Sequence, residues 1–392
     1  MTMQDSAVIK SGGSARTSNC KSVCVLAGDP SGDIAGFHFL RAFKKLQPDV
    51  KIFGLGGARM KSLGQEQFAD GADLAALGFW EVAKRFSFFR RLFYRVKREI
   101  EERRPALVVM IDYPGFNLRL AEKIKSLGIP LVYYIAPQVW AWGARRIPAI
   151  GRLVDRLLVI LPFEVEFFKQ HGISAEYVGH YLLDDIPEQL IGAAYDADSP
   201  RIALLPGSRQ QEVDRMLPVM LGAARALGDT QRFVIAGLSG SVKYDQVLAH
   251  FPEFSDQIVY DYTRESVAEA ALVISSSGTA TLETALIGRP LIVIYKTAWL
   301  TFQIAQRLVE APFVALANVV AGKRVAPELL QAKANVENIT NAARSLLGSH
   351  EARQIALEEW ALVRKALGVD TQDVTTKGGA SEKVAARAAS YL

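Results

Sequence analysis

Short runs of Val, Ile and Leu recur along the first half of the chain, and segments with helical periodicity separate them. The runs predict strands at 22–27, 51–55, 106–112, 131–135 and 157–161. Nearly continuous apolar strands that alternate with amphipathic helices are typical of a parallel sheet with both faces covered. We therefore expect the first half of the chain to form one doubly wound, Rossmann-like α/β domain.

The same alternation starts again after a segment that lacks it. Residues 183–200 are acidic and contain Pro187 and Pro200, which predicts a linker. Further strands are then expected at 201–205, 232–236, 257–260, 272–275 and 291–295, followed by helices alone. We expect a disordered tail at 1–19, an N-terminal domain at 20–182, the linker at 183–200, a C-terminal domain at 201–348 and C-terminal helices at 349–392. Ligands of such sheets bind beyond the carboxyl ends of the strands, so the expected site is a cleft between the domains.

Composition narrows the class of protein. Half of the 392 residues are hydrophobic and 22% are charged, which excludes a disordered chain. Cys20 and Cys24 are too few for a disulfide scaffold and fit a reducing compartment. No stretch approaches the ~20 apolar residues that a bilayer span needs, and residues 1–19 lack the apolar block of a secretory signal. We expect a cytoplasmic protein that meets a membrane, if at all, at its surface.

One segment combines basic and aromatic side chains. Residues 79–104 read FWEVAKRFSFFRRLFYRVKREIEERR, and the whole chain carries a formal charge of +5. Aromatic residues on one side of a helix and basic residues on the other suit the boundary of an anionic bilayer. The alternative is a helix that turns its aromatic side to the core and its basic side to solvent. No nucleic-acid-binding motif accompanies the segment, so nucleic acid is not an expected partner.

A strand-to-helix turn near the N-terminus carries several small and polar residues, AGDPSGD at 27–33. Small residues let a ligand approach the backbone, and a helix N-terminus offers N–H groups to an anion. The alternative is an ordinary turn in which Asp33 caps the helix.

A second turn, IDYPGFN at 111–117, follows a strand that is expected to be buried. A carboxylate at the end of such a strand is a natural general base, so Asp112 is the candidate. Burial would raise the pKa of this carboxyl, and a nearby cation would lower it again. The alternative is a structural aspartate that caps the next helix.

Two turns of the second half have the residues of a phosphate site. LPGSR at 205–209 offers backbone N–H groups and the guanidinium of Arg209, which can bind phosphate oxygens bidentately. SSSGTATLE at 275–283 opens a helix with small hydroxyl residues, and Glu283 could accept hydrogen bonds from ribose hydroxyls. The alternatives are a structural turn and a hydroxyl cap followed by a surface glutamate.

The signatures of common cofactors are missing. GLGG at 54–57 is not the GxGxxG fingerprint of nicotinamide-dependent enzymes, and no Walker A sequence is present. The five histidines lack metal-ligand spacing, and Cys20 and Cys24 have no partner pair. We therefore expect no cofactor and no metal.

Together these stretches resemble the lipid-A-disaccharide synthase family, glycosyltransferases of the GT-B fold. The resemblance covers nearly all of the chain after residue 20. It rests on AGDPSGD (27–33), GLGGARM (54–60), IDYPGFN (111–117), PQVWAW (137–142), LPFE (161–164), GHYLLDD (179–185), LPGSR (205–209), SSGTATLE (276–283) and NVVAGKRVAPELLQ (318–331). No single stretch is specific to this family. The order PQVWAW, then LPGSR, then SGTATLE is specific when all three occur together.

The resemblance implies an inverting transfer in lipid A biosynthesis, from UDP-2,3-diacylglucosamine to 2,3-diacylglucosamine 1-phosphate (lipid X). The products would be a β(1→6)-linked disaccharide 1-phosphate and UDP. It also implies two GT-B domains that face a cleft, and final helices that cross back or exchange between the subunits of a homodimer. The enzyme would be peripheral on the inner face of the cytoplasmic membrane. The alternatives are another UDP-sugar enzyme (an epimerase, or a transferase with a different acceptor) and a non-catalytic peripheral membrane protein.

The motifs and the resemblance together assign the site. Asp112 is expected to deprotonate the acceptor hydroxyl, and Arg209 to stabilise the departing UDP. The expected UDP-sugar site comprises Pro206, Gly207, Ser208, Arg209, Ser277, Gly278, Thr279, Glu283, Asn318 and Gln331. The expected acceptor site comprises Asp29, Ser31, Asp33, Asn117 and Trp140.

Two positions depart from the family's pattern. The family usually has Glu-Ala where this chain has Asp29 and Pro30, and commonly a second Asp where this chain has Gly115. Both positions lie in the N-terminal domain, so the departures concern the contacts expected with the acceptor.

Overall fold

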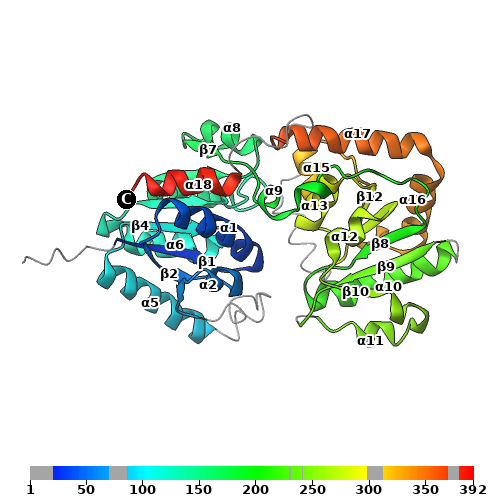
Figure 1. The fold of residues 1–392 in the computed structure, drawn as a ribbon, viewed down its shortest axis with the longest axis horizontal. Coiled ribbons are helices and arrows are strands. Elements are labelled where there is room, and N and C mark those ends of the chain that lie inside the picture. The colour runs from blue at the N-terminus through cyan, green and yellow to red at the C-terminus, as the bar shows by residue number, and fades with distance from the viewer. Residues whose placement is uncertain (1–20, 70–85, 229–230, 241, 298–311, 370–378) are drawn as a thin grey trace, which may run out of the picture.

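A computed structural model describes residues 21–69, 86–228, 231–240, 242–297, 312–369 and 379–392. These residues form two α/β units, each built on a parallel sheet (Figure 1). The expected doubly wound architecture is confirmed. The tail at 1–19 and Cys20 lie outside the described residues.

The N-terminal unit contains a seven-stranded sheet in the order β3-β2-β1-β4-β5-β6-β7. Its strands are β1 (Ser22–Ala27), β2 (Lys51–Leu55), β3 (Glu66–Gln67), β4 (Leu107–Ile111), β5 (Leu131–Tyr134), β6 (Arg156–Val159) and β7 (Ala175–Tyr177). Its helices are α1 (Pro30–Leu46), α2 (Ala58–Ser62), α5 (Phe86–Arg103), α6 (Pro114–Ile124), α7 (Ile147–Leu153), α8 (Phe163–Gln170) and α9 (Leu182–Asp185). The strand order reverses between β1 and β4, and ligands of open α/β sheets bind at such a switch point.

The C-terminal unit repeats this plan with six strands in the order β10-β9-β8-β11-β12-β13. Its strands are β8 (Arg201–Leu205), β9 (Arg232–Gly237), β10 (Ile258–Tyr260), β11 (Leu272–Ser276), β12 (Leu291–Tyr295) and β13 (Glu328–Leu330). Its helices are α10 (Gln210–Leu227), α11 (Asp245–Leu248), α12 (Thr263–Ala268), α13 (Thr279–Ile287), α15 (Leu316–Ala321), α16 (Val336–Gly348) and α17 (His350–Ala366). Here the order reverses between β8 and β11. The last helix of the sequence, α18 (Ala380–Ala389), lies on the N-terminal unit.

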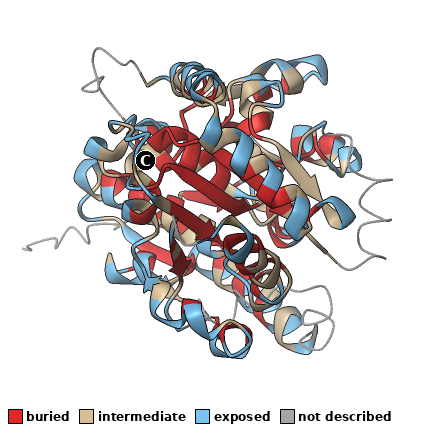
Figure 2. Cartoon of the chain, turned by 90° about the vertical axis from the view of Figure 1, so that its right-hand side faces the viewer, coloured by how far each residue is buried: buried red, intermediate tan, exposed pale blue. Residues whose placement is uncertain are grey.

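The central strands are buried on both faces, as their apolar sequences predict. Alternate residues of β1 enter different cores, with Val23 and Val25 on one side of the sheet and Cys24 and Leu26 on the other. Figure 2 shows the strands as the buried centre of the molecule and the outer faces of many helices as exposed. Burial raises the pKa of the Cys24 thiol, so this cysteine packs as a small apolar side chain.

Helix α1 begins earlier than the sequence predicts. Asp29 is its N-cap and accepts a hydrogen bond from the Gly32 N–H at 2.7 Å, while Pro30 occupies the first turn. The alternative in which Asp33 caps this helix is therefore wrong. Asp33 instead accepts the backbone N–H groups of Gly57 at 2.8 Å and Met60 at 3.1 Å, and so fixes the turn before α2.

The basic and aromatic segment is described from residue 86 onward, and Phe79 and Trp80 lie outside the described residues. Leu92, Val96 and Ile100 of α5 are buried in the core of the N-terminal unit. Phe88, Phe89 and Phe93 pack against the same core, whereas Arg90, Arg91 and Tyr94 are exposed. Within the described residues, no helix is both long enough and apolar enough to cross a membrane.

Helix α18 packs against α1 of the N-terminal unit, although α17 belongs to the C-terminal unit (Figure 1). Val384, Ala385 and Ala388 enter the same core as Ala35 and Phe39. The final helix thus returns to the N-terminal unit, one of the two arrangements that the sequence predicts. An exchange of helices between subunits stays a prediction.

A buried ion-pair network lies where the expected linker begins, and it joins the two units. The side chain of Asp185, only 8% exposed, accepts hydrogen bonds from His38 Nε2 at 2.8 Å and Arg59 Nη1 at 3.3 Å. Arg264 of the C-terminal unit pairs with the same carboxylate and donates to the Asp185 carbonyl oxygen at 2.6 Å. Arg264 also pairs with Glu283.

Candidate active site

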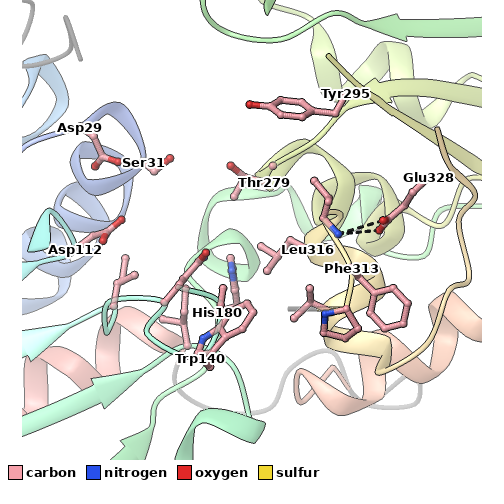
Figure 3. A pocket seen from close by; sticks show the side chains of 18 of the residues that line it. Asp29, Ser31, Asp112, Trp140, His180, Thr279, Tyr295, Phe313, Leu316 and Glu328 are labelled. Carbon is pink, nitrogen blue, oxygen red and sulfur yellow. Dashed lines mark hydrogen bonds between the residues drawn. The ribbon is translucent and has the colours of Figure 1, made fainter. Parts of the chain in front are cut away.

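The switch points of the two sheets open onto one cavity of about 690 Å³ (Figure 3). Asp29 and Ser31 follow β1 and Asp112 follows β4, whereas Arg209 follows β8 and Gly278 follows β11. Seven of the residues predicted for the site line this cavity: Asp29, Ser31, Asp112, Trp140, Arg209, Gly278 and Thr279. The expected cleft between the domains therefore exists, and residues from both units line it.

Asp112 is held in an unusual backbone conformation at the cavity wall. The backbone φ angle is 43° at Asp112 and 51° at Tyr113. Both residues therefore lie in the left-handed region, which residues other than glycine rarely adopt. The carbonyl oxygen of Asp112 accepts hydrogen bonds from Asn117 Nδ2 at 2.8 Å and from the Tyr133 hydroxyl at 2.6 Å. These bonds fix the turn that presents the Asp112 carboxyl to the cavity.

The surroundings of Asp112 favour its protonated form. Burial and, next, the negative charge of Asp29 raise the pKa of Asp112 to about 7, against an opposing hydrogen bond from the Tyr113 N–H. Burial also raises the pKa of Asp29, which the Gly32 N–H and the charge of Arg209 oppose. A carboxyl with a pKa near 7 can exchange a proton at neutral pH.

Trp140 lines the cavity, and Glu164 and Phe163 hold its indole ring in place. Its Nε1–H donates to Glu164 at 3.1 Å, and its ring meets the Phe163 ring edge to face at 5.1 Å between centroids. Burial raises the pKa of Glu164 to about 7, although the Leu161 N–H and the Trp140 N–H oppose this shift. The PQVWAW and LPFE stretches thus meet at one wall.

The C-terminal unit contributes an open helix end and a cation. Gly278, with φ 118°, precedes α13, and no side chain in the described part of the chain caps the first N–H groups of that helix. Arg209 is 66% exposed and pairs with Glu212 at 3.0 Å. Uncapped N–H groups and an exposed guanidinium are features of anion sites.

Nine of the predicted residues do not line the cavity. Pro206, Gly207, Ser208 and Ser277 flank lining residues in their own loops, and Ser208 donates its N–H to Glu212 at 3.0 Å. The other five have structural partners. Asp33 and Asn117 hold backbone turns, as described above, and Glu283 pairs with Arg264. The Asn318 amide bonds Ala326, Val325 and Glu328, and Gln331 faces the backbone of Thr297.

Several polar lining residues carry no prediction from the sequence. They are Gln138, His180, Tyr181, Tyr295, Thr297, Arg324 and Glu328. His180 and Tyr181 lie in the GHYLLDD stretch that carries part of the family resemblance, which was the available signal. Gly115, one of the two departures from the family's pattern, is exposed and lies outside this cavity.

Solved structures define the class. The fold resembles that of MurG from Acinetobacter baumannii, with a TM-score of 0.56 and 13% identity over 94% of this chain and 99% of that one. It also resembles the UDP-GlcNAc 2-epimerase from Neisseria meningitidis bound to UDP-GlcNAc, with a TM-score of 0.56 and 12% identity over 91% and 100% of the two chains. The molecule is therefore an α/β protein of the GT-B class.

Sequence similarity identifies the family within that class. The lipid-A-disaccharide synthetase profile matches residues 23–374. The lipid-A-disaccharide synthase of Syntrophus aciditrophicus (strain SB) is 40% identical over 95% of this chain and 98% of its own length. That of Myxococcus xanthus (strain DK1622) is 35% identical over 88% and 93%. The chain belongs to the lipid-A-disaccharide synthetase family and is a glycosyltransferase of lipid A biosynthesis.

Proposed function

We propose that the cavity binds UDP-2,3-diacylglucosamine and 2,3-diacylglucosamine 1-phosphate (lipid X) and joins them with inversion at the anomeric carbon. The 6-hydroxyl oxygen of the acceptor forms a bond to that carbon while the bond to the β-phosphate oxygen breaks. The electron pair leaves with UDP, and the hydroxyl proton passes to Asp112. The products are the β(1→6)-linked disaccharide 1-phosphate and UDP.

The placement of charge around the cavity supports this proposal. Asp112, with a pKa of about 7, lines the N-terminal side, while Arg209 and the open end of α13 line the C-terminal side. A general base works best with a pKa near the ambient pH, and a departing diphosphate is stabilised by cations and helix N-termini. The reacting carbon would lie between the two sets of groups.

We further propose that the transfer needs no metal and no organic cofactor. Arg209 and the N–H groups at Gly278 and Thr279 are the groups that we assign to the diphosphate. The test mixes protein, detergent, both lipid substrates and a chelator, and follows UDP release and the product mass. Tetraacyl disaccharide 1-phosphate is the expected product. UDP release without that product would favour another UDP-sugar enzyme, and no turnover and no UDP binding would favour the non-catalytic alternative.

Arg209→Ala should weaken UDP binding about 10–100-fold, because a charge-assisted hydrogen bond to the phosphates is lost. Isothermal calorimetry with UDP measures the effect. Arg225→Ala is the matched control, since Arg225 is an exposed arginine that pairs with Glu253 outside the cavity. Equal UDP affinity in wild type and Arg209→Ala would remove Arg209 from the site.

Asp29→Asn should extend activity to lower pH. Asp112 acts as a base only when ionised, so kcat/KM should rise as the pH rises through about 7. Removal of the Asp29 charge lowers the pKa of Asp112, while an asparagine still caps α1. The low-pH limb of kcat/KM should therefore move to lower pH. It should stay in place in Asp33→Asn, whose side chain lies outside the cavity, and an unmoved limb in both variants would contradict the coupling.

We also propose that the enzyme is cytoplasmic and peripheral, bound to the inner face of the cytoplasmic membrane. The exposed Arg90, Arg91 and Tyr94 of α5 support contact with an anionic surface. Sedimentation with anionic vesicles tests this contact, and Arg90→Glu with Arg91→Glu should reduce it. We also propose a homodimer whose subunits exchange α18. Light scattering of the purified protein measures its molar mass and so tests whether the dimer forms.

A further inference from the structure

His180 is a buried group at the cavity that the reaction above does not use. It lies between β7 and α9, on the segment that leads from one unit to the other, and its side chain is fully buried in the cavity wall. Its Nδ1 accepts the Leu182 N–H at 3.2 Å. Burial lowers the pKa of the ring to about 3, so the imidazole is neutral at physiological pH. A neutral ring whose Nδ1 accepts a hydrogen bond carries its proton on Nε2.

This Nε2–H has no acceptor among the residues that the structure describes. Among the described residues, no oxygen or nitrogen atom is a hydrogen-bond partner of His180 Nε2. The ring stacks on Tyr181 with 4.8 Å between centroids, which fixes its orientation. A buried N–H without a partner costs free energy and is rare in native proteins. Because none of the described residues accepts this N–H and His180 lines the cavity, a ligand in the cavity is the candidate acceptor.

The neighbours of His180 locate it relative to the reacting atoms. The adjacent Tyr181 lines the same cavity, together with Ser31 of the N-terminal unit and Thr279 of the C-terminal unit, so this segment runs along the boundary between the units. In Figure 3 His180 lies between Trp140 of the N-terminal unit and Thr279 of the C-terminal unit. If Asp112 takes the acceptor proton, the bond that breaks lies at the same boundary.

We propose that His180 donates a hydrogen bond from Nε2–H to a β-phosphate oxygen of the UDP-sugar and keeps it as UDP departs. Negative charge grows on the diphosphate as the bond from the sugar breaks, so this hydrogen bond strengthens in the transition state. A neutral ring donates throughout the reaction without giving up its proton. The proposal rests on the glycosyl transfer proposed above.

Three variants test the contact. His180→Phe removes the donor and keeps a ring, His180→Asn keeps an acceptor for the Leu182 N–H without an atom at Nε2, and His180→Gln restores an N–H near Nε2. We expect kcat to fall on the order of 10²-fold in the Phe and Asn variants and to recover in the Gln variant. Calorimetry should show UDP binding the Phe and Asn variants about 10-fold more weakly than wild type, with UMP affinity unchanged.

Comparison of UDP with UMP isolates the β-phosphate and needs no acceptor, so it stays informative even if lipid X is not the acceptor. Equal losses for UDP and UMP would show that the ring only shapes the cavity and would overturn the proposal. A fall in kcat with unchanged UDP affinity would place the contact on the sugar and would also overturn it. His171→Phe, which alters an exposed ring outside the cavity, should leave every value unchanged.

Discussion

Asp112→Asn should lower kcat about 10²–10⁴-fold and leave UDP affinity unchanged. The asparagine cannot take the acceptor proton, but it tolerates the left-handed backbone at φ 43° as well as aspartate does. The hydrogen bonds from Asn117 and Tyr133 end on the backbone carbonyl of residue 112, so they survive the substitution. Steady-state kinetics with both lipid substrates and calorimetry with UDP measure the two quantities.

Asp261→Asn is the matched control for this change. Asp261 is also a left-handed aspartate, with φ 62°, but it is exposed and lies outside the cavity. Its substitution tests whether an asparagine in this conformation harms the enzyme in general. Wild-type kcat in a folded Asp112→Asn protein would exclude Asp112 as the base.

Asp185→Ala should lower the free energy of unfolding by about 1.5–3 kcal/mol, because His38 and Arg264 each lose a charge-assisted hydrogen bond in a partly buried network. Arg264 would keep Glu283 as its only carboxylate partner among the described residues, and His38 would lose its acceptor. Glu122→Ala is the control, since Glu122 forms an exposed pair with Arg152 and should cost less than about 1 kcal/mol. Chemical denaturation at pH 7 compares the three proteins.

The same effect should depend on pH. Burial alone would raise the pKa of Asp185, but the hydrogen bonds from His38 and Arg264 and the charge of Arg264 outweigh it and hold the pKa well below its usual range. A carboxyl with a depressed pKa stabilises the fold above its unfolded pKa of about 3.9, and this contribution is lost as the pH falls further. The stability difference between wild type and Asp185→Ala should therefore persist at pH 7 and narrow below about pH 4. A difference under about 1 kcal/mol at pH 7 would contradict the role of the network.

The central strands and the loops after them were predictable because their chemistry is local. A long apolar run identifies β1, β4, β8 and β11, and the next few residues are then placed at the carboxyl edge of a sheet whatever the rest of the chain does. Asp112 and Gly278 reach the cavity for this reason. The strands β3, β7 and β13 escaped prediction because each is short and contains a glutamate, which breaks the apolar run. The equally short β10 is apolar throughout and was predicted.

Pairing between distant segments explains why several of the predicted residues do not line the cavity. Glu283 follows a turn of the phosphate-binding type, but its carboxylate pairs with Arg264 of another helix. The sequence around Glu283 does not predict this partner. Asn318 is buried by contacts with residues 325–328. His180 is of interest because its Nε2–H has no hydrogen-bond acceptor among the described residues. The hydrophobic periodicity of a sequence cannot reveal such an unpaired donor.

Because α18 covers α1, the N-terminal unit is completed by residues that the ribosome adds only after the C-terminal unit. All strands of its sheet have been synthesised once translation reaches Tyr177. Val384 and Ala388 of α18, in contrast, emerge only after the whole C-terminal unit. The apolar side of α1 around Phe39 therefore waits uncovered throughout translation of the second half. Nascent chains should expose this surface to chaperones, and a stop codon just before residue 380 should destabilise the half of the protein that was made first.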